Sequence, residues 1–561
     1  MLGLFAFFGV VLQVQHCLGR VPQSQLAALS DLYEATGGKE WVFKTAGCQR
    51  EAFFSNTLHD DLNPKETELC LEEREKAVMI QGSVAWNLTK DSLGQFLVDP
   101  CLPKTWLGIT CNTANNAVVG LNLQSYGLRG SLPTSLGQLS SLISLNLGDN
   151  CLEGPVPSTA VGGLHSLTAL SLFCNAFDSE IPSALVALTL LTELRLFANA
   201  FKGSLPSVLG QLSKMTTLDV SSNDLSGYPV PSELGLLKQL QYLNLENNGF
   251  TGVVPTALGG LSSLTSVNMG ANSFTGSLPP AFSQLTDLVL VDISDNQFTG
   301  GLDTFRNLFH LVLLDISNNE FTGELQAMGN LTRLMDLDVA SNDLSGDFTA
   351  LGESLGLLTF LDVSDNSLGG SISSGVGSFR SLVELGLNNN YLTGRIPTQL
   401  MSLKLRKLDL SVNSLQGVVP SGGLATWGVN MVFLDLQSNQ LTGPLPTAIA
   451  LLTALEVIRI GNNPMTGSSL PTELWTLAAL KEIDLGNCGL AGSITPAIGN
   501  MRGLTRLAFG RNRLSGSLPA EIGACTGLTM IDATFNSLSG ELPTQIGALR
   551  ALTMLDVSHN R

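Results

Sequence analysis

The sequence of 561 residues has little charge and few aromatic side chains. Charged residues make up 14% of the chain, whereas typical globular domains contain about 25%. Basic residues are especially scarce: the chain has 29 Lys and Arg against 47 Asp and Glu, which gives a net charge of −18. A nucleic-acid-binding surface must neutralise phosphates, so this acidic balance excludes nucleic acid as a partner. The 44% of hydrophobic residues excludes an intrinsically disordered chain.

Long apolar runs are also missing. The single candidate, residues 2–14, is too short to cross a bilayer but has the length of a signal-peptide core. We therefore predict a signal peptide at 1–19, no membrane-spanning segment in this chain, and a protein of the secretory pathway that is extracellular or at the cell surface. Because no basic residue precedes the run, the start of a buried helix is the alternative.

Catalytic and metal-binding motifs are absent from the sequence. The five histidines are scattered without paired ligand spacing, and there is no P-loop, kinase or HExxH motif. One GxSxG match at 352–356 falls inside a repeat, where a nucleophile elbow has no strand-to-helix turn. We expect no catalytic residues, no metal and no cofactor.

Four of the nine cysteines fall within one short segment. An even number in a secreted chain predicts two disulfides with three possible connectivities, of which we favour sequential pairing. Zinc is the alternative, but no CxxC pair is present. These four residues are Cys48, Cys70, Cys101 and Cys111. We expect Cys488 and Cys525, at buried repeat positions, to be free thiols, and leave Cys151 and Cys174 open.

From Val118 onward, one unit of about 24 residues recurs, as in LDVSDNSLGGSI at 361–372. Its fixed point is a residue, usually Asn, that we call the register residue. Leucines or equivalents five and three positions earlier alternate inward along a short strand, and stacked strands pair into a parallel sheet. The register Asn then needs partners, which backbone groups of adjacent turns can supply. Gly stands four positions later in all complete repeats but one, which indicates a tight turn. The register residues are 126, 150, 175, 199, 223, 248, 272, 296, 319, 342, 366, 390, 413, 439, 463, 488, 512, 536 and 560.

This repeat resembles the plant-type extracellular leucine-rich repeat, as in LNLENNGFTGVVPTALGGLSSL at 243–264. The segments LSDLYEATGGKEW at 29–41 and DPCLPKTWLGITC at 99–111 resemble the N-terminal cap of that family. The resemblance implies an α/β fold: a right-handed solenoid with short parallel strands on the concave face and 3-10 segments behind. We expect an α-helical, disulfide-containing cap domain at 20–117 and a solenoid of 18 to 19 repeats at 118–561.

The sequence departs from the family pattern in three places. The cap carries a long insertion between Trp41 and Cys101, no proline occurs between residues 281 and 396, and the chain stops at LDVSHNR inside a repeat. From that last feature we expect a fragment, after which a membrane anchor and a kinase domain could follow.

The outward positions of the strands suggest a binding site. Four consecutive repeats carry Asp four positions before the register residue, which places like charges on adjacent strands. We predict that a cationic ligand meets this row; a local hydrogen bond to the neighbouring Ser is the plainer explanation. An apolar strip beside it predicts an interaction surface, unless a flanking element or glycan covers it. The tentative ligand-binding residues are Leu290, Asp292, Leu313, Asp315, Met335, Asp338, Phe360 and Asp362.

The leading hypothesis is a recognition protein that resembles the ectodomain of a leucine-rich-repeat receptor kinase or receptor-like protein. It would bind a peptide, protein or glycan on the concave face, with a co-receptor as a further candidate partner. A secreted inhibitor of an extracellular hydrolase and a structural cell-surface protein are the alternatives. Two sequons, at Asn87 and Asn330, are candidate glycosylation sites.

Overall fold

The computed structural model describes residues 22–36, 101, 107–114, 116–351 and 354–561. The predicted signal peptide, the cap insertion, Cys48, Cys70 and Asn87 lie outside the described residues. The described chain divides into two compact units, which we call unit 1 (up to 275, with 279–288) and unit 2 (276–278 and 289–561). No helix in these described ranges combines the length and apolarity needed to cross a membrane.

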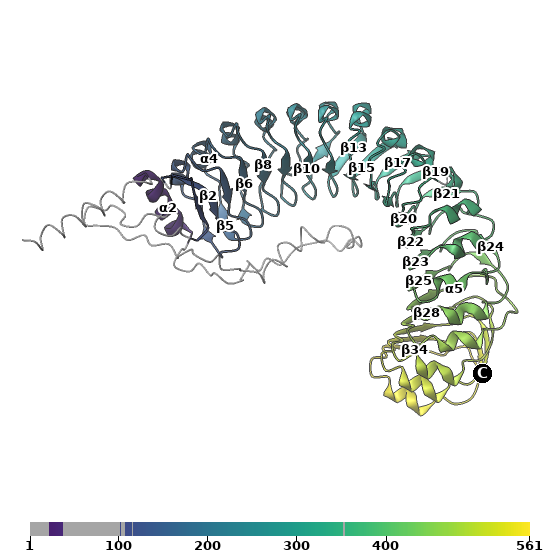
Figure 1. Cartoon of the computed structure of the whole chain (residues 1–561). Helices are drawn as coiled ribbons and strands as arrows, with labels where there is room; N and C mark the ends of the chain where they lie inside the picture. The colour runs from purple at the N-terminus through teal and green to yellow at the C-terminus, as the bar shows by residue number, and fades with distance from the viewer. Residues whose placement is uncertain (1–21, 37–100, 102–106, 115, 352–353) are drawn as a thin grey trace, which may run out of the picture. The chain divides into compact units, whose positions relative to one another are not determined.

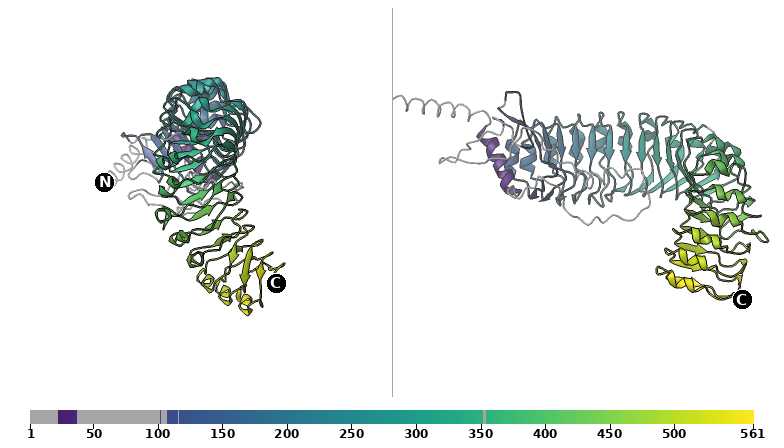
Figure 2. Two further views of the ribbon diagram at one scale, coloured as in Figure 1. Left: turned by 90° about the vertical axis from the view of Figure 1, so that its right-hand side faces the viewer. Right: turned by 60° about the horizontal axis from the view of Figure 1, so that its bottom comes forward.

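Each turn of the solenoid contributes one short strand, and consecutive strands pair in parallel within each unit (Figures 1 and 2). The strands of unit 1 are β1 (Ile109–Cys111), β2 (Val118–Asn122), β4 (Ser144–Asn146), β6 (Ala169–Ser171), β8 (Glu193–Arg195), β9 (Thr217–Asp219), β10 (Tyr242–Asn244) and β12 (Ser266–Asn268). Those of unit 2 are β14 (Leu290–Asp292), β16 (Leu313–Asp315), β18 (Asp336–Asp338), β20 (Phe360–Asp362), β22 (Glu384–Gly386), β23 (Lys407–Asp409), β25 (Phe433–Asp435), β27 (Val457–Arg459), β28 (Glu482–Asp484), β30 (Arg506–Ala508), β32 (Met530–Asp532) and β34 (Met554–Asp556).

The core follows the repeat as predicted. Leu361 and Val363, five and three positions before a register residue, are fully buried, whereas Asp362 between them lies on the opposite face of the strand. All seventeen glycines four positions after a register residue have positive φ, so each forms the predicted turn. The α/β solenoid predicted from the sequence is therefore confirmed.

After the register residue, most turns form a second short strand and then a helix. The second strands are β3 (Arg129–Gly130), β5 (Cys151–Gly154), β7 (Ala176–Phe177), β11 (Thr251–Gly252), β13 (Ser273–Ser277), β15 (Gln297–Gly301), β17 (Glu320–Gly323), β19 (Asp343–Asp347), β21 (Ser367–Gly369), β24 (Gln416–Gly417), β26 (Gln440–Leu441), β29 (Ala491–Gly492), β31 (Arg513–Gly516) and β33 (Ser537–Leu538).

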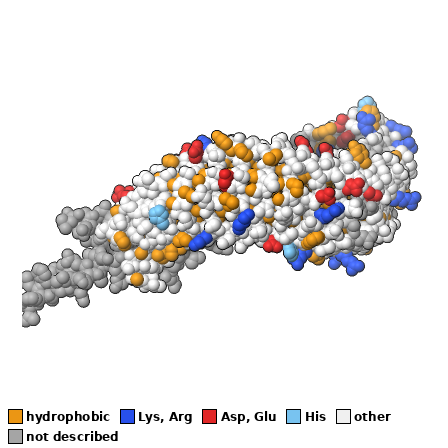
Figure 3. All heavy atoms as spheres, turned by 90° about the horizontal axis from the view of Figure 1, so that it is seen from above, with side chains coloured by type: hydrophobic (Ala, Val, Ile, Leu, Met, Phe, Trp, Pro, Cys, Tyr) orange, Lys and Arg blue, Asp and Glu red, His pale blue; other side chains and the backbone are white. Residues whose placement is uncertain are grey.

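The helices behind the strands are predominantly 3-10 helices. They are η3 (Thr134–Gln138), α4 (Ser158–Gly162), η4 (Ser183–Ala187), η5 (Ser207–Gln211), η6 (Ser232–Leu236), η7 (Thr256–Gly260), η8 (Pro280–Gln284), η9 (Leu302–Phe305), η10 (Leu325–Met328), η11 (Phe348–Leu351), η12 (Ser374–Ser378), η13 (Thr398–Ser402), α5 (Leu424–Trp427), η14 (Thr447–Leu451), η15 (Thr472–Thr476), η16 (Pro496–Asn500), η17 (Ala520–Ala524) and η18 (Thr544–Ala548). The space-filling view shows few charged side chains and singly scattered hydrophobic ones over much of the surface that it presents (Figure 3).

The register Asn residues form a buried hydrogen-bond ladder. Asn342 donates from Nδ2 to the carbonyl of Ile316 in the preceding turn at 3.0 Å, and its Oδ1 accepts from the amide of Phe321 at 2.9 Å. At one turn the thiol of Cys488 takes this place and donates to the carbonyl of Ile460 at 3.3 Å. The predicted backbone partners of the register Asn are thus present, and Cys488 and Cys525 are buried free thiols as predicted.

The proline-free window has a local cause on the helical side of the repeat. In turns with proline, such as Pro255 before η7, the proline is the N-cap of the helix. Inside the window, η9 and η10 follow Gly301 and Glu324 directly, and the register interval shortens from 24 to 23 residues. In these two turns the missing proline therefore accompanies a shorter connection from the strand to the helix.

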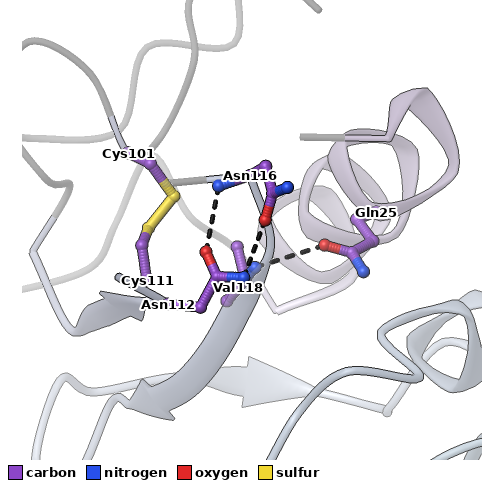
Figure 4. The surroundings of a disulfide bond; sticks show 6 residues. All are labelled: Gln25, Cys101, Cys111, Asn112, Asn116 and Val118. Atoms are coloured by element: carbon purple, nitrogen blue, oxygen red, sulfur yellow. Dashed lines mark hydrogen bonds between the residues drawn. A yellow bond between two sulfur atoms is a disulfide. The ribbon is translucent and has the colours of Figure 1, made fainter. Parts of the chain in front are cut away.

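The described part of the cap contacts β2, the first strand of the solenoid (Figure 4). Helix α2 (Gln23–Ala35) places Gln25 so that its Oε1 accepts a hydrogen bond from the amide of Val118 at 3.3 Å. Strand β1 pairs antiparallel with β2, and the predicted disulfide between Cys101 and Cys111 is present. Cys151 and Cys174, which the sequence left open, are both disulfide-bonded.

Candidate ligand-binding face

The four predicted aspartates form one row in unit 2. The strand register pairs Asp292 with Asp315, Asp315 with Asp338, and Asp338 with Asp362. The backbones of neighbouring members are therefore about 4.8 Å apart across the sheet, which is the ordinary spacing between strands. The structure thus brings all four predicted carboxylates together on one face of β14, β16, β18 and β20.

Each of these aspartates also has a local structural role. Oδ1 of Asp315 accepts from the amide and the hydroxyl of Ser317 at 2.9 and 2.7 Å, and Oδ1 of Asp338 accepts from the amide of Ala340 at 3.0 Å. These bonds form an Asx turn at the end of the strand. A local hydrogen bond to the residue two positions later, which is the plainer explanation of the row, therefore explains why these side chains carry an acceptor oxygen, Oδ1.

Asn residues on four strands of unit 1 stand at the same position, and they make the same turn without the charge. Oδ1 of Asn146 accepts from the amide of Gly148 at 3.0 Å, and Oδ1 of Asn268 accepts from the amide of Gly270 at 2.9 Å. An amide oxygen thus suffices for the turn, so the negative charge in unit 2 is not a requirement of the fold.

Burial makes that charge costly at the centre of the row. Asp338 is 2% exposed, and its pKa is raised well above the usual range by burial and by the neighbouring carboxylates of Asp315 and Asp362. Further along the sheet, burial raises the pKa of Asp409 and raises that of Asp435 to about 6.

The predicted apolar strip covers two repeat positions. Leu290, Leu313 and Phe360 occupy the position six residues before the register residue, and on β18 that position is Asp336. Met335 stands seven residues before the register residue, where its side chain is 45% exposed.

Asp336 is the residue of this face that the sequence analysis missed. It is 7% exposed, and its register neighbours are Leu313 on β16 and Phe360 on β20. Burial, together with the carboxylates of Asp315 and Glu384, raises its pKa to about 7.

The apolar residues beside the row also replace a polar pattern. Seven positions before the register residue, threonines elsewhere donate to the preceding turn, as Thr192 does to the carbonyl of Thr168 at 3.0 Å. Val289, Val312 and Met335 hold this position in three consecutive turns of unit 2. Val289 is 40% exposed and Met335 is 45% exposed, so the replacement creates exposed apolar surface beside the carboxylates.

The basic residues toward the C-terminal end are bound to acidic neighbours on the same face. Arg459 contacts Glu482 at 3.0 Å and Asp435 at 3.4 Å, and its guanidinium also lies over the ring of Phe433. Of the two sequons, Asn330 lies exposed after η10, so glycosylation there stays a prediction.

Family models match two parts of the chain. A model of the leucine-rich repeat region matches residues 226–418, and a leucine-rich-repeat model matches 430–452 and 479–501. The chain thus carries leucine-rich repeats in these segments. Among solved structures it is similar to the plant peptide hormone receptor RGFR1 in complex with RGF2, at 29% identity and a TM-score of 0.68, over 81% of this chain and 83% of that one.

Two further similar proteins are receptor kinases. The Arabidopsis receptor kinase HAESA, solved with the peptide hormone IDA and the co-receptor SERK1, is 29% identical with a TM-score of 0.67, over 83% of this chain and 85% of that one. The LRR receptor-like serine/threonine-protein kinase GSO2 of Arabidopsis thaliana is 43% identical over 54 residues, which are 10% of this chain and 4% of that relative's length. The chain thus resembles the ectodomains of plant receptor kinases and spans a small part of the curated relative.

Proposed function

We propose that this chain is the ligand-binding ectodomain of a cell-surface receptor and that it binds an extracellular peptide on the face of β14, β16, β18 and β20. The observation that carries the proposal is the apolar surface formed by the exposed Val289 and Met335 and the half-buried Val312 beside a row of carboxylates. Neither feature is needed by the repeat, because other turns fold with Thr and Asn at these positions.

The similar structures support the ligand class. RGFR1 is solved with RGF2 and HAESA with a peptide hormone and a co-receptor. We extend the peptide ligand, a co-receptor and an extracellular location to this chain as parts of the proposal. Exposed apolar residues beside charged ones suit a peptide, since the apolar contacts supply affinity and the charges supply selectivity.

The test uses a phage-displayed library of random 12-residue peptides. Peptides are selected on the wild-type chain and then measured against Val289→Asp/Met335→Asp. Leu236→Asp/Val253→Asp is the matched control, because those two side chains are 59% and 60% exposed and lie off the strand face.

We expect selected peptides to bind the wild type and the control but not the face variant, with unchanged thermal unfolding in all three proteins. Equal binding to the face variant, or no enriched peptide at all, contradicts the proposed function.

A further inference from the structure

Asp336 is a buried carboxylate whose surroundings do not explain its presence. It is 7% exposed, between Leu313 and Phe360 in the strand register. Within the described residues, no hydrogen bond or ion pair reaches its carboxyl group. The position does not require an acid, because Leu290, Leu313 and Phe360 hold it on the neighbouring strands.

Such a group is expensive to keep ionised. A buried carboxylate without a counter-charge costs several kcal/mol, or it takes up a proton instead. The surrounding charges increase that cost: Asp315 on β16, Asp362 on β20 and Glu384 on β22 are all acidic, and Asp338 lies two residues along the same strand. Glu384 also has an exposed basic neighbour, Arg406, whose guanidinium lies 3.7 Å from its carboxylate.

Residue alternation shows where the carboxyl points. Leu337 is fully buried in the core, so Asp336 and Asp338 on either side of it lie on the opposite, strand-face side. The carboxyl group of Asp336 therefore points to the same strand face as its register neighbours Leu313 and Phe360.

We propose that Asp336 and Asp338 together hold one cationic side chain, lysine or arginine, of a peptide whose flanking apolar residues lie on Val289, Leu313 and Phe360. This inference rests on the proposed function and names the chemistry of its ligand. A cation placed here offsets the repulsion among the acidic side chains and gives Asp336 the ion-pair partner that a buried charge requires.

A side chain fits this site better than a metal ion. Among the described residues, no group of three or more His, Cys, Asp or Glu side chains is arranged to hold a metal. The register neighbours of Asp336 are apolar, and an alkyl stem that ends in an ammonium or guanidinium group matches an apolar wall around a carboxylate.

Proton release accompanies binding of this kind. The pKa of Asp336 is raised to about 7 in the free protein, and a bound cation favours the ionised carboxyl. Peptide binding therefore expels a proton, so affinity strengthens as pH rises from 5 to 8 and weakens in acid.

The experiment repeats the 12-residue library selection in parallel on the wild type and on Asp336→Asn/Asp338→Asn. Asparagine keeps the Asx turn at 338, as Asn146 and Asn268 do in unit 1. Asp532→Asn is the matched control, because its Oδ1 also accepts from the residue two positions later but lies outside the proposed site.

We expect wild-type peptides to be enriched in Lys and Arg, and the best of them to lose about tenfold or more in affinity on the double variant. The affinity of the best wild-type peptide should rise with pH when it is measured on the wild type and on Asp532→Asn, but not on the double variant.

Three results overturn the inference. Peptides that need Val289 and Met335 but show no cation enrichment refute it while the proposed function stands. Cation enrichment and pH dependence that persist in the double variant also refute it. A selection that yields no peptide dependent on Val289 and Met335 refutes both.

Discussion

Units 1 and 2 use the same turn at the end of each strand but different chemistry within it. Unit 1 has Asn at this position in four of its seven turns, and unit 2 has Asp in nine of its twelve. Oδ1 accepts the same hydrogen bond in both, at 3.0 Å in Asn244 and 2.8 Å in Asp362. Asn and Asp thus make the same turn, and Asp is much more frequent at this position in unit 2 than in unit 1, where Asp219 is the one example.

The position seven residues before the register residue, where several turns have threonine, also differs between strands of the two units. Thr168, Thr192 and Thr216 tie consecutive turns of unit 1 together, whereas Val289, Val312 and Met335 give up that bond in unit 2. Two departures from the repeat therefore coincide on β14, β16 and β18. The carboxylates are unfavourable to bury, and the apolar side chains are unfavourable to expose to water.

The largest expected effect is one that the two units share. Asn175→Ala in unit 1 and Asn342→Ala in unit 2 each leave buried backbone carbonyls without their donor, and each should cost about 3 kcal/mol. Hydrogen exchange of the adjacent turns measures the loss, with the exposed Asn307→Ala as the control. A large loss in only one unit would show that the ladder is not common to both.

The next effect should appear in unit 2 alone. Because the pKa of Asp336 is about 7 when folded and near 3.9 when unfolded, the unfolded chain gives up this proton first as pH rises. This group therefore lowers stability as pH rises from about 4 to 7, by about 2–4 kcal/mol in total. Hydrogen exchange of β16, β18 and β20 at pH 4.5 and 7.5 tests this.

The control for the pH effect is Asp336→Asn, which should flatten the dependence in these strands. The corresponding strands β4, β6 and β8 of unit 1 should change little over the same range. A pH dependence that survives in Asp336→Asn would assign the effect to another group.

A smaller effect concerns the backbone one position before the register residue. All nineteen turns hold this residue at positive φ, a conformation that disfavours β-branched side chains. Val412 has φ 52°, so Val412→Asn should stabilise unit 2 by about 1 kcal/mol. Val418→Asn, at another exposed valine, is the control and should not stabilise.

Much of the fold could be predicted from the sequence, because the repeat specifies the strands, the Asn ladder and the glycine turns residue by residue. The site could be predicted only in part. The aspartate row follows from counting positions, but the burial of Asp336 depends on the side chains of Leu313 and Phe360 in two other turns. The sequence also did not reveal that the helices at Leu302 and Leu325 begin six residues after the register residue, whereas η7 begins eight residues after it.

The central claim is that these departures serve a ligand and not the fold. The most direct test is the free energy of unfolding, at pH 7.5, of a variant without these features: Val289→Thr, Val312→Thr, Met335→Thr, Asp336→Asn and Asp338→Asn. The account predicts stability equal to or above that of the wild type, since buried acidic groups are removed and Asn keeps the turn. A loss of about 2 kcal/mol or more would contradict it and show that these side chains stabilise the solenoid itself.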